Sequence, residues 1–278
     1  MIHDLIWIAL LWLIVGWIAG TFGSLVGLGG GVIIVPMLLF SATIHPQFAH
    51  ITPAIAVGTS MLLIILTACS SSLSYAKQGK IDFTVGWLFF IACGPGALIG
   101  AYCTRFFPVD RFYIAFSLLM LLVAFLLGLK KRPPTKRLRW DVHRSKIIDG
   151  KVVEYGYHRL SALGLALFVG FCSGLFGIGG GSLLVPIMVM LYGFPPHVAT
   201  ATSMFTIFLT SIFGSAAHVV QGNVDWFAVL CLAPGSWIGG HSGAWIASRL
   251  PSQKLLLILR ISFMIVAIRM LLKGLHLI

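Results

Sequence analysis

The sequence predicts an all-α polytopic membrane protein built from two homologous halves. Only 9% of its 278 residues are charged and 59% are hydrophobic, whereas a soluble domain carries about 25% charged residues. Several runs with few or no charges reach the roughly 20 residues that a helix needs to cross a bilayer. A set of short motifs also occurs twice in the same order. These three observations exclude a soluble domain and point to a duplicated bundle of membrane helices.

Five helical segments are expected in each half. The N-terminal apolar run has no Lys or Arg before it, so we expect a membrane helix there and not a cleaved signal peptide. The expected ranges in the first half are about 5–26, 32–42, 53–76, 83–104 and 110–129. Those in the second half are about 159–176, 182–192, 197–220, 225–247 and 254–273. The chain therefore divides into a repeat at 1–129, a basic stretch at 130–158 and a repeat at 159–278.

The duplicated motifs define these halves. "GLGGGVIIVP" at 27–36 recurs as "GIGGGSLLVP" at 177–186, and "AVGTSM" at 56–61 recurs as "ATATSM" at 199–204. Further along, "QGKIDF" at 78–83 matches "QGNVDW" at 221–226, and "PGALIG" at 95–100 matches "PGSWIG" at 234–239. A shared order over so many motifs indicates an internal repeat.

The short apolar stretches after the glycines cannot cross a membrane alone. Their 11 or so residues rise only about 17 Å, against a hydrocarbon core of about 30 Å. Each is therefore either re-entrant or half of a helix broken at mid-depth, which gives 8–10 transmembrane helices in all. Non-helical backbone at that depth must be buried in protein or line a cavity. The charge distribution slightly favours inverted over parallel halves. We expect the inverted arrangement, because broken helices that meet at the midplane are a recurrent transporter plan.

The basic stretch accounts for much of the net charge of +12. Residues 130–159 hold ten of the nineteen Lys and Arg residues. Basic clusters beside membrane helices are typical of cytoplasmic loops, and they attract anionic lipid headgroups. We therefore expect a cytoplasmic loop and no nucleic-acid partner.

The glycine breaks are the first candidate binding site. Glycine at a helix start leaves backbone N–H groups open to an anion at the positive end of the helix dipole. Two such starts could enclose one small oxyanion; the alternative is that the glycines only allow close helix packing. The residues concerned are Gly29, Gly30, Gly31, Gly179, Gly180 and Gly181.

The Thr-Ser pairs add candidate hydroxyl donors on the next helix of each half. They are Thr59 with Ser60 and Thr202 with Ser203. Their matched positions suggest a role in lining the substrate path. The alternative is that they bond to carbonyls of their own helix, as Ser and Thr often do in membranes.

Five further polar residues are candidates for gating or proton coupling. Asp82 and Asp225, preceded by Gln78 and Gln221, stand at helix–turn–helix junctions, where capping of the following helix is the simpler interpretation. His218 lies near the end of the second Thr-Ser helix and could titrate near neutral pH, or it could be a hydrogen-bonded structural residue. The five cysteines and the histidines show no metal-binding spacing, so we expect no metal and no cofactor.

The duplicated "GLGGG…VP" and "GIGGG…VP", with "TSM", "QG…D" and "PG…IG" after each, resemble the TauE/SafE sulfite exporter family, also called the 4-toluene sulfonate uptake permease family. The resemblance covers about 5–129 and 159–273. It implies a multi-pass protein of the cell inner membrane that transports sulfite, sulfoacetate, thiosulfate or another organosulfonate. Both export and uptake occur in the family.

The predicted function is therefore secondary transport of a small sulfur-containing oxyanion by alternating access around the paired breaks. The expected partners are this anion, the lipid bilayer and, as a coupling ion, H⁺. The alternatives are a small-anion channel, a membrane-embedded enzyme and an accessory subunit. We expect no enzymatic activity, because no catalytic dyad or metal cluster has a credible spacing.

Overall fold

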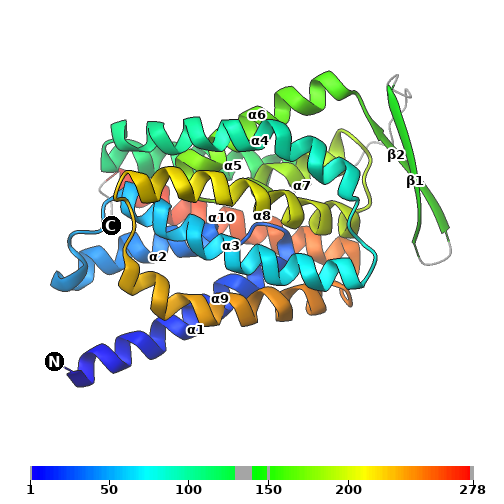
Figure 1. Ribbon diagram of the computed structural model, residues 1–278. Helices are drawn as coiled ribbons and strands as arrows, with labels where there is room; N and C mark the ends of the chain where they lie inside the picture. The colour runs from blue at the N-terminus through cyan, green and yellow to red at the C-terminus, as the bar shows by residue number, and fades with distance from the viewer. Residues whose placement is uncertain (1, 129–139, 149–150, 276–278) are drawn as a thin grey trace.

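The computed structural model describes residues 2–128, 140–148 and 151–275, and these residues are mostly helical (Figure 1). The first five helices are α1 (Ile2–Val26), α2 (Gly31–Ile44), α3 (Pro53–Lys77), α4 (Phe83–Cys103) and α5 (Val109–Gly128). The next five are α6 (Arg159–Phe176), α7 (Gly181–Met190), α8 (Pro196–Val220), α9 (Trp226–Ala247) and α10 (Ser252–Gly274). Every helical segment expected from the sequence is present, with each end within three residues of its expected position.

Five of these helices are long and apolar enough to cross a membrane, as far as the described residues go: α1, α3, α4, α6 and α8. Helix α2, with 14 residues, and α7, with 10, are the short ones. Short 3₁₀ turns at Pro46–Phe48 and Thr104–Phe106 connect α2 to α3 and α4 to α5.

The basic stretch contains a β-hairpin that the sequence analysis described only as a loop. Strand β1 (Val142–Ile148) pairs antiparallel with β2 (Lys151–Tyr157), in register from Val142 opposite Tyr157 to Ile148 opposite Lys151. Valine, isoleucine and tyrosine, which favour extended backbone, alternate here with charged residues. Because of this mixture, a prediction based on charge alone does not identify the strands.

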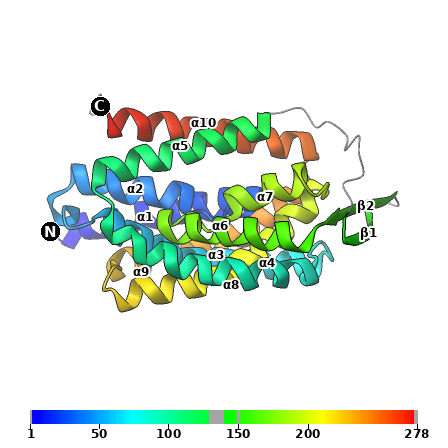
Figure 2. The same ribbon diagram turned by 90° about the horizontal axis from the view of Figure 1, so that it is seen from above.

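The helices pack across the two halves of the chain rather than within them. Helix α1 lies along α9, α4 along α6, and α5 along α10, while α3 and α8 contact each other at the centre (Figures 1 and 2). Exchanging each of α1–α5 with its counterpart in α6–α10 turns the α1–α9 pair into the α6–α4 pair. The same exchange leaves the α5–α10 and α3–α8 pairs unchanged. The packing is thus symmetric with respect to the two halves.

Small residues make the closest of these contacts and also fix the helix directions. A Cβ at Gly16 would meet the backbone of Leu232, and one at Gly20 that of Ser236, so α1 and α9 run in the same direction. Helices α3 and α8 run in opposite directions. Gly58 lies beside His218, whereas Ile64, further along α3, contacts the same glycines as Ile207, which comes earlier in α8. Small side chains allow such close backbone approach in membranes.

The molecule has two distinct ends (Figure 1). At one end, here called the terminal end, α1 begins and α2 and α10 finish. At the other, the hairpin end, β1 and β2 project beyond the helices. Helix α1 runs from the terminal end towards the hairpin end, and α6 runs the opposite way.

Candidate functional site

Two glycine loops interrupt the helical backbone at corresponding places. One joins α1 to α2 and the other joins α6 to α7. In the first, Gly29 and Gly30 have φ of 78° and 93°; in the second, Gly179 and Gly180 have φ of 74° and 70°. These angles lie in the left-handed region, which glycine alone adopts without strain.

The two loops touch each other at the centre of the molecule. A Cβ added at Gly31 would collide with the carbonyl oxygen of Gly177, and one at Gly181 would collide with that of Gly27. Ile64 of α3 and Ile207 of α8 contact the loops from the central helices. Close packing therefore accounts for glycine at 31 and 181, and anion binding by the same residues stays a prediction.

The helix starts at these loops keep free donors. Among the described residues, no acceptor receives the backbone N–H of Gly31 or of Gly181, which open α2 and α7. Because the positive ends of two helix dipoles coincide with these amides, the centre of the molecule favours negative charge.

The serines of the Thr-Ser pairs bond to the glycine loops. Ser60 Oγ donates to the carbonyl of Gly177 at 2.9 Å, whereas Ser203 Oγ lies 3.2 Å from the carbonyl oxygen of Gly27 and 2.8 Å from that of Thr200 in its own helix. Each central helix is thus fastened to the loop of the opposite half. In this conformation both hydroxyls are used within the protein.

The threonines of the same pairs bond to the two aspartates. Thr59 Oγ1 accepts from the N–H of Asp225 at 2.9 Å, and Thr202 Oγ1 accepts from that of Asp82 at 3.0 Å. Both aspartates cap the helix that follows, since each carboxylate accepts from an N–H in the first turn, at 3.3 Å for Asp82 and 2.9 Å for Asp225. This is the capping interpretation, and each carboxylate still has a second oxygen for another partner.

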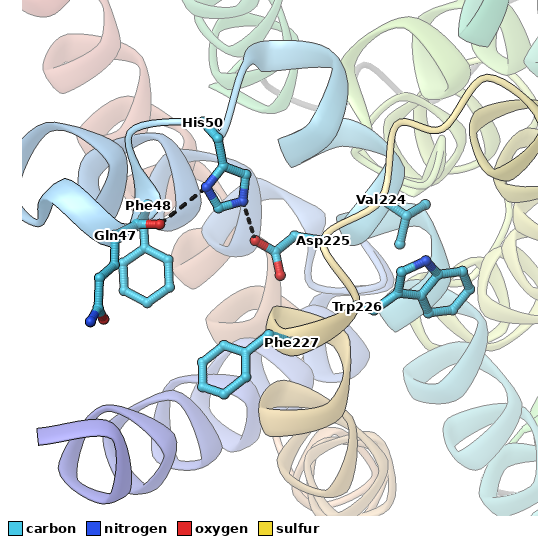
Figure 3. Close-up of a pocket in the computed structure, with 7 residues that line it drawn as sticks. All are labelled: Gln47, Phe48, His50, Val224, Asp225, Trp226 and Phe227. Carbon is cyan, nitrogen blue, oxygen red and sulfur yellow. Dashed lines mark hydrogen bonds and ion pairs between the residues drawn. The ribbon is translucent and has the colours of Figure 1, made fainter. Parts of the chain in front are cut away.

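At the terminal end that partner is a histidine (Figure 3). His50 Nε2 lies 2.8 Å from Asp225 Oδ2, and Nδ1 lies 3.1 Å from the carbonyl oxygen of Gln47. Both acceptors need a donor, so only the doubly protonated imidazole makes both bonds. A cavity of about 390 Å³ opens beside this pair, with Phe48 and Phe227 among its lining residues. We call the His50–Asp225 pair the terminal contact.

At the hairpin end the partner is a tyrosine of β2. Tyr155 OH donates to Asp82 Oδ2 at 2.9 Å, and Arg144 of β1 lies 3.9 Å from Asp82 Oδ1. The Tyr155 ring packs on Phe194, which follows α7, with centroids 4.2 Å apart. Burial raises the pKa of Tyr155 and the charge of Asp82 raises it further, so this hydroxyl remains a donor. We call the Tyr155–Asp82 pair the hairpin contact.

The remaining predicted residues lie at or near the ends of α8 and α3. His218 is fully buried, with Nε2 3.3 Å from the carbonyl oxygen of Gly174, while its Nδ1 has no partner among the described residues. Gln221 donates to the carbonyl of Ala217 one turn earlier, and Gln78 is exposed at the end of α3.

Two hydroxyls beside the glycine loops escaped the sequence analysis. Ser173 lies against Gly180 and Thr200 lies against Gly27, both are buried, and neither hydroxyl has a partner among the described residues. A buried hydroxyl without a partner is costly. A search for duplicated residues could not find them, because the matching positions hold Gly23 and Val57.

Within the described ranges, no group of three His, Cys, Asp or Glu side chains could hold a metal ion. The five cysteines are free thiols, two of them buried.

Comparison with known proteins places this chain among membrane transporters. A family model described as Sulfite exporter TauE/SafE matches residues 12–270. The probable membrane transporter protein YunE of Bacillus subtilis is 43% identical, over 94% of this chain and 96% of its own length. The probable membrane transporter protein MJ0441 of Methanocaldococcus jannaschii is 33% identical, over 76% and 72%. One from Xylella fastidiosa is 26% identical, over 87% and 86%. No solved structure matches the chain.

Proposed function

This chain belongs to the sulfite exporter TauE/SafE family, and from that premise we propose that it is a secondary transporter of a small sulfur-containing oxyanion. The names of the family and of its relatives indicate a multi-pass membrane transporter. The proposed cargo is sulfite, thiosulfate, sulfoacetate or another organosulfonate. The observation that carries the proposal is that the helix starts at Gly31 and Gly181 each lie against the glycine loop of the opposite half, beside Gly177 and Gly27.

The proposed architecture is an inverted repeat, 1–129 and 159–278, with α2 and α7 re-entrant. The exchange symmetry of the helix contacts supports it, as do the opposite directions of α1 and α6. The basic stretch 130–158 is then cytoplasmic, which puts the hairpin end inside the cell and the terminal end outside the inner membrane.

The proposed binding site is the space that opens when the glycine loops separate. Its donors are the amides of the helix starts and the hydroxyls of Ser173 and Thr200, joined by Ser60 and Ser203 as their bonds to the loops break. A sulfite or sulfonate group has three acceptor oxygens, and neutral donors hold such a group without a buried cation. Modest affinity suits a carrier, which must release its cargo.

Alternating access follows from the two end contacts in this proposal. Opening of the terminal contact separates the loop after α2 from the start of α9. Opening of the hairpin contact separates the start of α4 from the hairpin beside α7. The two contacts open in turn, so that the site faces one side at a time. The terminal contact is the proposed point of proton coupling, because it pairs an imidazole with a carboxylate.

Thermal melts of the detergent-purified protein test the site. Sulfite, thiosulfate, sulfoacetate, sulfate, phosphate and chloride are added separately, since a ligand that binds only the folded state raises Tm with occupancy. Ser173→Ala and Thr200→Val remove hydroxyls that bond to nothing else, so both variants should fold. Ser211→Ala is the matched control, because its hydroxyl is also buried without a partner but lies further along α8.

We expect a rise in Tm with one or two sulfur oxyanions, reduced in both site variants and retained in the control. If both site variants respond as fully as the wild type, the site is not at the glycine loops. A response to phosphate and chloride equal to that for sulfur oxyanions would contradict the assigned cargo.

A further inference from the structure

An apolar groove runs along the outside of α2, between α2 and α10. Its volume is about 740 Å³, and its apolar walls include Val32, Ile33 and Pro36 of α2 and Ile265 and Val266 of α10. Such a volume is that of a ligand site rather than of a packing defect. The groove begins beside the glycine loop and reaches Thr43, near the end of α2.

The groove has the length of one membrane leaflet. From Val32 to Thr43, α2 rises about 17 Å, close to half of the roughly 30 Å hydrocarbon core. Helix α10 lies beside it and finishes at the same end of the molecule (Figure 2). The part of the groove near Thr43 is therefore at the depth of lipid headgroups, and the part near Val32 is at the depth of acyl chains.

Two cations gather at the headgroup end of the groove. Arg269 Cζ lies 5.1 Å from the centroid of the Phe40 ring, and Lys273 Nζ lies 5.7 Å from Phe40 and 5.3 Å from Tyr113. Aromatic faces hold cations in place at such distances. Among the described residues, no carboxylate forms an ion pair with either side chain. Within residues 2–128, 140–148 and 151–275, the two like charges therefore have no anionic partner.

Only one of the two cations lacks a counterpart in the first half. With Pro108 aligned to Pro251, the position that corresponds to Arg269 holds Leu126, whereas the position that corresponds to Lys273 holds Lys130. A residue required symmetrically by alternating access would be expected in both halves. Arg269 therefore serves something that approaches only one face of the molecule.

We propose that this groove binds one phospholipid with an anionic headgroup. The phosphate of the headgroup is held by Arg269 and Lys273, and one acyl chain lies in the apolar groove against α2. Charge complementarity selects an anionic lipid over a zwitterionic one. A free anion would pair with the cations but leave the apolar walls uncovered. Because the acyl chain lies along α2, which begins at the glycine loop, the lipid also stabilises the position of α2.

Native mass spectrometry of the purified protein, titrated with phosphatidylglycerol or with phosphatidylcholine of the same chains, tests this proposal. A basic residue near an anionic lipid contributes about 1 kcal/mol, which is about fivefold in affinity. Arg269→Gln with Lys273→Gln should therefore weaken phosphatidylglycerol binding about 30-fold. Arg260→Gln is the matched control, because Arg260 is exposed on the same helix but does not line the groove. Val266→Trp fills the groove and should displace the lipid with both charges present.

The expected result is a preference for phosphatidylglycerol that both groove variants lose and the control retains. Equal binding of the two lipids by the wild type, or equal losses in the control and the charge variant, would overturn the proposal. Glycerol phosphate is added as a soluble headgroup, and displacement of the lipid at equal concentration would show a site for a free anion instead. If the charge variant fails to fold, the Val266→Trp result decides.

Discussion

At the scale of single residues, the centre of the molecule contains buried hydroxyls of two kinds. Ser60 and Ser203 donate to glycine-loop carbonyls, whereas Ser173 and Thr200, beside the same loops, have no partner among the described residues. The first kind holds the loops closed, and the second is available to a ligand. Burial is the same for both, so only the hydrogen bonds separate structural from functional candidates.

Ser203→Ala tests the structural kind. It removes the hydroxyl shared by the carbonyls of Gly27 and Thr200, so it should lower the free energy of unfolding by about 1 kcal/mol. Ser211→Ala, on the same helix, removes a hydroxyl that makes no bond and should cost less. Denaturant unfolding in detergent measures both, and equal losses would show that the Ser203 bond contributes nothing.

Gly31→Ala tests the contact between the loops. The new Cβ would collide with the carbonyl oxygen of Gly177, so we expect a loss of at least about 3 kcal/mol, the upper range for overpacking. Gly164→Ala is the control, because nothing lies near a Cβ at that position of α6. Melting temperatures compare the two, and an unchanged Gly31→Ala protein would show that the loops do not meet.

At the scale of elements, the β-hairpin supplies the partner of the aspartate at one end, and a loop residue supplies it at the other. His50, between α2 and α3, contacts Asp225. The loop between α7 and α8 is shorter and supplies Phe194, on which Tyr155 of β2 packs to reach Asp82. The hairpin thus completes a contact that the shorter loop cannot make alone.

The hairpin contact should depend on alkaline pH. Folding raises the pKa of Tyr155 through burial and the charge of Asp82. Its contribution to stability is therefore complete below about pH 10, the ordinary value for tyrosine, and is lost as the pH rises towards the folded value. Tyr155→Phe keeps the ring but should make Tm less sensitive between pH 9 and 11. Exposed Tyr102→Phe is the control, and equal sensitivity in all three proteins would contradict the contact.

The elements differ in how far the sequence predicts them. Long apolar runs determine the ten helices, and the short run after Gly31 shows by length alone that α2 cannot span. The capping roles of Asp82 and Asp225 follow from their place before a helix. The hairpin does not follow, since its strands are rich in charge. Nor does the His50–Asp225 contact, which joins residues far apart in sequence without a duplicated counterpart.

At the scale of the whole molecule, helices of the first half pack against helices of the second half. The same kinds of contact therefore recur at the terminal end and at the hairpin end. Each aspartate is held by a threonine of the other half, and each glycine loop by a serine of the other half. These bonds connect both ends of the molecule to its centre. That property is what a carrier with a central site requires.

Single cysteines test the inverted arrangement. In a protein without its five native cysteines, Gln47→Cys lies at the terminal end and Gln78→Cys at the hairpin end, and both positions are exposed. We expect an impermeant thiol reagent to label Gln47→Cys from outside the cell and Gln78→Cys only after the membrane is opened. Labelling of both from one side would contradict the inverted repeat.

The most direct test of the central claim is the flux of a labelled sulfur oxyanion into vesicles containing the purified protein. Uptake of labelled sulfite or thiosulfate is followed with and without the same unlabelled anion inside. The account predicts saturable uptake that internal anion accelerates, and a weaker effect with Thr200→Val. Uptake no faster than in protein-free vesicles for every sulfur oxyanion, or uptake that never saturates, would contradict a carrier of these anions.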